Sequence, residues 1–198
     1  MEKHAPQQQS PAQSQSAPQP SKLFAIGDLV IYPLHGKCQI TGIESKSISG
    51  ESIAFYKVEV VRSAFARTTR KEPAIWIPIT TAAERGLRPP MTSETLATIW
   101  TLLENKEYYF SASEPWNTLH LKLEAAIRNE GAIGLAKAAA YLQALKRRII
   151  VLSPEVAKVS EGTTKLLVRE IADLTGESIR VIEERMQKAI RHKQLPDH

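Results

Sequence analysis

The hydrophobic pattern of the chain changes near residue 90, and this change constrains the fold more than any other feature of the sequence. Before it, short apolar runs are broken every 8–12 residues by Gly, Pro and Ser, which is typical of small β-domains. After it, apolar residues recur three to four positions apart, which is typical of helices. The sequence therefore predicts an α+β protein with a β-domain first and a helical domain second.

The N-terminal segment has a third kind of composition. Residues 1–22 contain six Gln, four Pro and four Ser, and the first large apolar residue after Met1 is Leu23. Such a segment buries too little apolar surface to offset the entropy of ordering its backbone, about 1–2 kcal/mol per residue. We therefore predict a disordered tail at 1–22, a β-domain at 23–90 and a helical domain at 91–198.

Strands and helices can be placed more closely from turn and capping residues. Strand-like runs lie at 28–32, 37–44, 53–61 and 74–77, and the basic stretch 62–71 predicts an exposed hairpin loop between the last two. About five helices are expected: one from Thr92, then 113–128, 136–147, 153–174 and 177–193. Thr92, Ser113 and Ser153 are the predicted N-caps, and Gly131 and Gly134 indicate a break before the third helix.

Signals of catalysis, metal binding and membrane insertion are missing from the sequence. It has no P-loop, dinucleotide-binding, HExxH or CxxC motif, and its five histidines are scattered. The single cysteine, Cys38, cannot form an internal disulfide and fits a reducing compartment. No run approaches 18 apolar residues, and no signal peptide is evident. We expect a binding protein without an enzyme activity, metal, cofactor or membrane segment.

The charge of the chain permits an acidic partner. Its net charge is +5, of which +3 lies on residues 23–90 and +1 on residues 91–198. A nucleic-acid contact of the helical domain must therefore come from a local patch, and the candidate is Lys146-Arg147-Arg148. These three residues also suit the negative end of a helix dipole, so a helix cap and a phosphate contact are equally good interpretations.

The three tryptophans call for different interpretations. Trp100 is in helical register with Leu96 and Leu103, which predicts a core position. Trp76 alternates with its apolar neighbours in a strand, which predicts partial exposure. Trp116 lies at the start of a helix, where it either packs as a hydrophobic staple or inserts as a wedge into the minor groove of DNA.

Several of these segments together resemble one protein family. Residues 24–36 read Phe-Ala-Ile-Gly-Asp-Leu-Val-Ile-Tyr-Pro-Leu-His-Gly, which resembles the start of the CarD/CdnL family of bacterial RNA-polymerase-binding transcription regulators. Further matches are Ile43-Glu44, Ser49-Gly50, Ile77-Pro78, residues 86–89, Trp116, Leu152-Ser153 and residues 165–172. The resemblance covers about residues 23–175.

This resemblance implies a fold and a function. It implies that residues 23–90 form a Tudor-like small β-barrel, shared with the transcription–repair coupling factor, that docks on the RNA polymerase β subunit. The helical domain would meet promoter DNA near the upstream edge of the melted bubble. There Trp116 would wedge into the minor groove and stabilise the open promoter complex. We expect a monomer in the cytoplasm, associated with the nucleoid.

The resemblance also assigns candidate contacts to polymerase. A basic contact of the family falls on Lys46, and a second one falls on Trp76, which is not basic. The predicted loop at 62–71 can replace the missing charge, and Arg67 and Arg70 are its candidates. Lys46, Trp76, Arg67 and Arg70 are therefore the expected polymerase-binding residues.

The expected DNA contacts depart further from the family. Relatives carry an Arg pair after the wedge, where this chain has Thr118 and Leu119. Lys122 and Arg128, further along the same helix, can partly replace this pair. The expected DNA-binding residues are therefore Trp116, Lys122, Arg128, Lys146, Arg147 and Arg148. The missing arginines favour an alternative, a polymerase-binding adaptor whose helical domain binds another protein rather than DNA.

Overall fold

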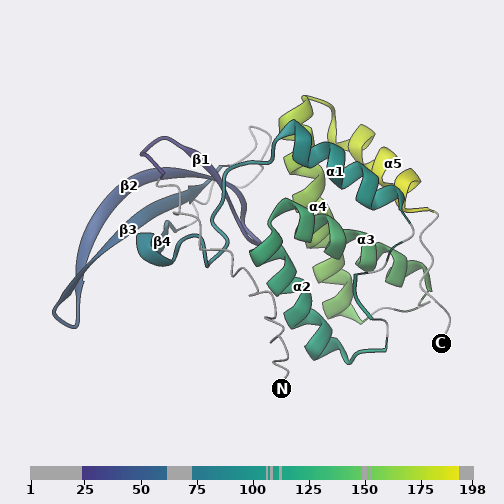
Figure 1. The fold of residues 1–198 in the computed structure, drawn as a ribbon, viewed down its shortest axis with the longest axis horizontal. Helices are drawn as coiled ribbons and strands as arrows, with labels where there is room; N and C mark the ends of the chain where they lie inside the picture. The colour runs from purple at the N-terminus through teal and green to yellow at the C-terminus, as the bar shows by residue number, and fades with distance from the viewer. Residues whose placement is uncertain are drawn as a thin grey trace, which may run out of the picture.

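The two predicted kinds of structure lie side by side in the computed structural model of the chain (Figure 1). The structure describes residues 24–61, 73–105, 107, 109–111, 113–148, 151 and 153–191. The predicted tail at 1–22 and the predicted loop at 62–71, with Arg67 and Arg70, lie outside the described residues. Within these ranges, four strands come first and five α-helices follow, so the α+β fold class is confirmed.

The strands form one antiparallel sheet in chain order. They are β1 (Leu29–Tyr32), β2 (Gly36–Ile48), β3 (Glu51–Val60) and β4 (Ile75–Pro78). Ser49 and Gly50 join β2 to β3 with φ values of 53° and 87°, as a two-residue hairpin turn with two positive φ angles requires. The paired ends of β2 and β3 extend beyond both edge strands as a ribbon that points away from the helices (Figure 1).

The closed Tudor-like barrel that the resemblance implied is not confirmed, because the sheet is open. Closure requires the first and last strands to pair, but the described strands pair only in the order β1-β2-β3-β4. The outer edge of β1 is occupied instead by Arg88. Ile31 N–H donates to the Arg88 carbonyl at 2.7 Å, and Arg88 N–H donates to the Ile31 carbonyl at 3.1 Å.

One face of this sheet buries the core of the β-domain. Residues that share this face include Val30, Cys38, Ile40, Tyr56, Val58 and Ile77, all at most 2% exposed. Leu87, which follows the short 3₁₀ helix η1 (Ile79–Thr81), packs into the same core, as does Phe24. The Phe24 ring packs edge-on against the Tyr56 ring. The backbone N–H of Phe24 donates to the Tyr56 hydroxyl at 2.9 Å.

The helical domain is built around its third helix. The helices are α1 (Ser93–Glu104), α2 (Trp116–Glu130), α3 (Ala132–Arg148), α4 (Pro154–Thr175) and α5 (Ile179–Ile190), and α3 contacts the other four. Gly134 lies inside α3, so the prediction that it marks a break was wrong. A Cβ at Gly134 would lie 1.9 Å from the Ala126 carbonyl oxygen of α2, so glycine serves close helix packing here.

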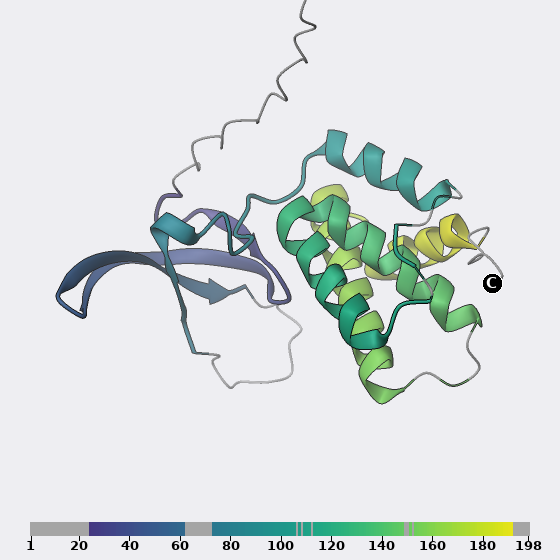
Figure 2. The ribbon, with the colours of Figure 1, turned by 60° about the horizontal axis from the view of Figure 1, so that its bottom comes forward.

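Two of the three predicted N-caps are confirmed. Thr92 accepts a hydrogen bond from Thr95 N–H at 3.2 Å, and Ser153 accepts one from Val156 N–H at 3.4 Å. The prediction for Ser113 was wrong, because α2 begins three residues later and Pro115 occupies its N-cap without a side-chain hydrogen bond. Trp116 is consequently the first residue of α2. In Figures 1 and 2, this end of α2 and the first turn of α4 lie at the same end of the helical domain.

Candidate functional site

The solvent-facing side of the sheet brings together two of the predicted polymerase-binding residues. Lys46 of β2 places its Nζ 3.3 Å from the ring centroid of Trp76, which lies two strands away on β4. Phe55 and Lys57 of β3 lie between them, with Lys46 Nζ 6.0 Å from the Phe55 ring and Lys57 Nζ 5.8 Å from the Trp76 ring. These four residues are called the Lys46–Trp76 surface below.

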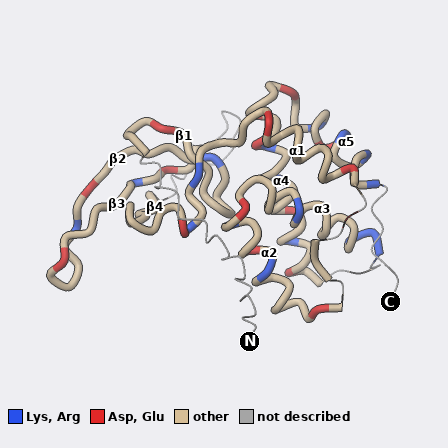
Figure 3. The backbone as a smooth tube through the Cα atoms, viewed as in Figure 1, with Lys and Arg blue, Asp and Glu red and all other residues tan. Residues whose placement is uncertain are grey.

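The Lys46–Trp76 surface suits a protein partner that offers carboxylates. Trp76 is half-buried, as the alternation of its strand predicts, and Phe55 is buried on this face outside the main core. The indole and the two ammonium groups form a flat aromatic area with positive charge above it. Aromatic residues such as Trp76 and Phe55 are enriched where proteins bind each other. Figure 3 shows that acidic residues flank these lysines along β2 and β3, so the positive charge is local.

Trp116 lies at one end of the helical domain, and the His120 ring covers one face of its indole. It is half-buried against the helical core, and its indole stacks on the His120 ring with centroids 5.3 Å apart and planes inclined by 23°. Its buried Nε1 has no hydrogen-bond partner among the described residues. This position is compatible with a staple and with a wedge that turns outward. Trp100, by contrast, is 9% exposed and packs in the core, as predicted.

Of the predicted DNA-binding cations on α2, Lys122 contacts Glu114, two residues before Trp116, and Arg128 lies far along the helix. Lys122 Nζ forms an ion pair with Glu114 Oε1 at 2.6 Å, so its charge is already partly neutralised. Arg128 lies twelve residues along the same helix, about 18 Å from Trp116 at the rise of an α-helix. Its Cγ would lie 3.2 Å from a Cβ on Gly86, which places it at the junction with the β-domain.

The basic patch of Lys146, Arg147 and Arg148 forms the exposed last turn of α3. Arg147 Nη2 donates to the Ile190 carbonyl at 2.7 Å, and Nη1 donates to the Arg191 carbonyl at 3.0 Å. The guanidinium therefore caps the C-terminal end of α5, while its Nε donates to the Gln143 carbonyl of its own helix at 3.4 Å.

Two side chains of the helical domain have shifted pKa values, Glu161 of α4 and Tyr141 of α3. A hydrogen bond from Lys165 and the charge of Lys165 lower the pKa of exposed Glu161, with a smaller contribution from Lys146. Burial raises the pKa of Tyr141, the nearby Glu114 carboxylate raises it further, and Arg148 opposes these effects.

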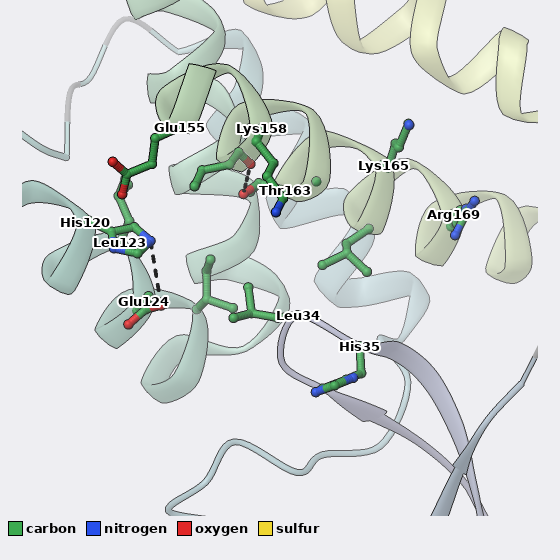
Figure 4. A pocket seen from close by; sticks show the side chains of 14 residues that line it. Leu34, His35, His120, Leu123, Glu124, Glu155, Lys158, Thr163, Lys165 and Arg169 are labelled. Carbon is green, nitrogen blue, oxygen red and sulfur yellow. Dashed lines mark hydrogen bonds and ion pairs between the residues drawn. The ribbon is translucent and has the colours of Figure 1, made fainter. Parts of the chain in front are cut away.

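A cleft of about 490 Å³, which the sequence did not reveal, lies between α2, α4 and the turn at 33–35 (Figure 4). Its apolar wall includes Leu123, Ile127 and Leu166, and basic side chains at its edge are Lys158, Lys165 and Arg169. These basic residues recur at intervals of seven and four along α4, a spacing that places them on one face of the helix and that can be recognised in the sequence. Nothing in the sequence indicates that the turn at 33–35 closes the cleft.

In the described part of the chain, no group of three or more His, Cys, Asp or Glu side chains could hold a metal ion. No helix in these ranges combines the length and the hydropathy needed to cross a membrane.

Comparison with known proteins identifies part of the β-domain. No curated protein matches the chain. Residues 24–66 match the family model described as the CarD-like/TRCF RID domain, and this segment covers β1, β2 and β3 with the Lys46 position. The match supports the assignment of residues 24–66 to the CarD/TRCF family of RNA-polymerase-interacting domains.

Proposed function

We propose that this protein is a transcription regulator that binds the RNA polymerase β subunit and stabilises the open promoter complex. The observation that carries the proposal is the polymerase-interacting domain match at residues 24–66, on the sheet that carries Lys46. The protein acts in this proposal as a monomer in the cytoplasm, at the nucleoid, without catalysis, metal or cofactor.

The β-domain docks on the β subunit through the Lys46–Trp76 surface. Lys46 matches a basic contact of the CarD/CdnL family, and Trp76 takes the place of the second one. The stacked arrangement supports this role, because the indole holds the Lys46 ammonium group beside it at 3.3 Å from its centroid. Two lysines and one indole then form a single contact area for carboxylates of the partner.

The helical domain acts on promoter DNA at the upstream edge of the bubble through Trp116. Docking on polymerase raises the effective concentration of Trp116 at this place, so weak DNA contacts suffice. That requirement agrees with a net charge of +1 on residues 91–198. A wedge that favours open over closed DNA by about 1.4 kcal/mol shifts the equilibrium about tenfold.

The direct test is the lifetime of open promoter complexes with purified polymerase. We expect the full-length protein to prolong this lifetime and Trp116→Ala to abolish the effect while binding to the β subunit is kept. Trp100→Phe, at the buried tryptophan, is the matched control and should keep both properties. Failure of the unmodified protein to bind the β subunit would overturn the whole proposal.

A second candidate function is an adaptor that binds polymerase and a further protein. It is favoured by the internal engagement of two predicted DNA-binding cations, Lys122 with Glu114 and Arg147 with the end of α5. Leu119, at the position of a family arginine, is buried. The same experiment separates the two functions, because an adaptor binds the β subunit and leaves the open-complex lifetime unchanged.

A further inference from the structure

The connection between the two domains is very short. Leu87 packs in the core of the β-domain and Met91 packs in the core of the helical domain, so Arg88, Pro89 and Pro90 span the distance. Each proline ring fixes its φ angle near −65°. The connection therefore has few ways to bend.

One carboxylate of α4 binds both ends of this connection. Arg88 Nη1 donates to Glu170 Oε1 at 2.7 Å and Arg88 Nη2 donates to Oε2 at 2.8 Å, a bidentate pair. Met91 N–H, on the far side of the two prolines, donates to the same Oε1 at 3.0 Å. The Glu170 side chain is 6% exposed, so water competes little for these contacts.

Arg88 is in turn fixed from three other directions. Its backbone exchanges two hydrogen bonds with Ile31 of β1, and its Nη1 donates to the Pro89 carbonyl at 3.2 Å. Its side chain passes over Gly131, where a Cβ would lie 2.8 Å from Arg88 Cδ and where φ is 60°. The single residue Arg88 therefore joins β1, the α2–α3 turn and α4.

Other contacts across the junction agree with a fixed geometry. Lys37 of β2 forms an ion pair with Asp173 of α4 at 3.2 Å. A Cβ on Gly36, at φ 77°, would lie 2.9 Å from Leu166 Cδ2 of α4, so the two domains approach closely here.

We infer that Arg88 and Glu170 are positioning residues that hold the two domains in one orientation before any partner binds. The purpose of this rigidity rests on the proposed function. A protein that contacts polymerase with the Lys46–Trp76 surface and DNA with Trp116 gains most when the two are held at a fixed separation. Neither Arg88 nor Glu170 needs to touch polymerase or DNA for this role.

The test compares Glu170→Gln with Glu161→Gln in the full chain. The amide of Glu170→Gln keeps an oxygen that accepts from Met91 N–H and loses the charged fork with Arg88. Glu161 is an exposed carboxylate of the same helix that accepts a hydrogen bond from Lys165. Spin labels at Ser47→Cys and Gln187→Cys, both exposed, report the distance between the domains, and buried Cys38 is protected from labelling.

We expect a narrow distance distribution for the unmodified chain and for Glu161→Gln, and one about twice as broad for Glu170→Gln, because a bidentate contact has been lost. Arg88→Lys, which keeps the charge and loses the bidentate contact with Glu170, should also broaden the distribution. Equal widths in all four proteins would overturn the inference. A circular dichroism melt of each variant confirms that the domains themselves are folded.

A functional measurement then separates this inference from the proposed function. With Glu170→Gln, we expect β-subunit affinity within about twofold of the unmodified protein, and an open-complex lifetime effect reduced about fivefold or more. If the unmodified protein does not prolong that lifetime, the proposed function fails, and the distance distributions still test the positioning role. If Glu170→Gln broadens the distribution and keeps the full lifetime effect, Arg88 and Glu170 hold the two domains together, but open-complex stabilisation does not depend on that fixed orientation.

Discussion

The Lys46 ammonium group lies 3.3 Å from the ring centroid of Trp76, although β3 separates their strands. The register places both residues on one face of the sheet but four positions apart along β3, because Lys46 pairs with Ile53 and Trp76 pairs with Lys57 on the other edge of the same strand. Both side chains project from the face opposite the core. The long Lys46 side chain then reaches across β3, above Phe55, to the indole.

Reversal of the charge of Lys46 should therefore weaken polymerase binding with little effect on folding. We expect Lys46→Glu to lower the affinity for the isolated β subunit at least about tenfold, since one favourable charge becomes an unfavourable one. The free energy of unfolding should fall by about 1 kcal/mol or less, as an exposed cation–π contact contributes about that much. Calorimetric titration with the β subunit and urea unfolding measure the two quantities.

The matched control for Lys46→Glu is Lys188→Glu on α5, an exposed lysine of the helical domain with the same change in net charge. It should leave the β-subunit affinity unchanged. Equal losses of β-subunit affinity in Lys46→Glu and Lys188→Glu would mean that overall charge, rather than the Lys46–Trp76 surface, determines binding.

Local signals in the sequence predicted most of the secondary structure and missed what depends on distant partners. The N-caps at Thr92 and Ser153 were found because a cap and its helix are adjacent in the chain. Ser113 misled because Pro115, two residues later, took the N-cap position. The closed barrel that the resemblance implied is not confirmed, because closure depends on whether the first and last strands pair, and the edge of β1 pairs with Arg88 instead.

Gly134 offers a test of helix packing, because it was mistaken for a helix break. In Gly134→Ala, the new Cβ would lie 1.9 Å from the Ala126 carbonyl oxygen, and backbone cannot move aside as a side chain can. We expect the free energy of unfolding to fall by about 3 kcal/mol, as in strongly overpacked cores. Urea unfolding followed by circular dichroism measures this loss.

The control for Gly134→Ala is Gly162→Ala on α4, where no atom lies within 4 Å of the new Cβ. Alanine is the better helix former, so this variant should gain about 0.5–1 kcal/mol. If Gly134→Ala does not lower the free energy of unfolding relative to Gly162→Ala, the close approach of α2 and α3 is contradicted.

Arg147 tests whether the basic patch of α3 is structural. Arg147→Met removes the donors to the Ile190 and Arg191 carbonyls and should lower the free energy of unfolding by about 1–2 kcal/mol. Lys146→Met, the neighbouring exposed change, should cost less than about 0.5 kcal/mol. If both variants have the same free energy of unfolding and both fail to prolong the open-complex lifetime, the patch contacts phosphates and its capping role is minor.

The candidate site was harder to predict than the fold for the same physical reason. Lys46 and Trp76 were identified through the family resemblance, and their contact depends on strand register across β3. Arg147 was identified as a phosphate contact or a cap, but the two carbonyls that it caps, those of Ile190 and Arg191 at the end of α5, lie more than 40 residues away. The cleft beside α4 is formed by three separate segments, and a residue pattern within α4 alone does not show where they meet.

Tyr141 should make the helical domain sensitive to alkali. Burial and the Glu114 carboxylate raise the pKa of its hydroxyl above the ordinary value near 10, so the folded state keeps this proton longer than the unfolded state does. Its contribution to stability is therefore full below about pH 10 and is lost as the pH rises through the folded-state pKa. Tyr141→Phe should lose about 0.5–1.5 kcal/mol at pH 8, from the hydrogen bond to the Ser111 carbonyl at 3.3 Å.

The pH dependence of this loss distinguishes a titrating Tyr141 from a merely packed one. As the pH rises above about 10, the difference between Tyr141→Phe and the unmodified protein should shrink, because Phe has no proton to release. Urea unfolding at intervals from about pH 8 to about pH 11 measures both curves. Glu114→Gln, which removes the second cause of the raised pKa, should reduce the alkaline loss in part. A constant difference between Tyr141→Phe and the unmodified protein across this range would show that Tyr141 does not titrate as its surroundings predict.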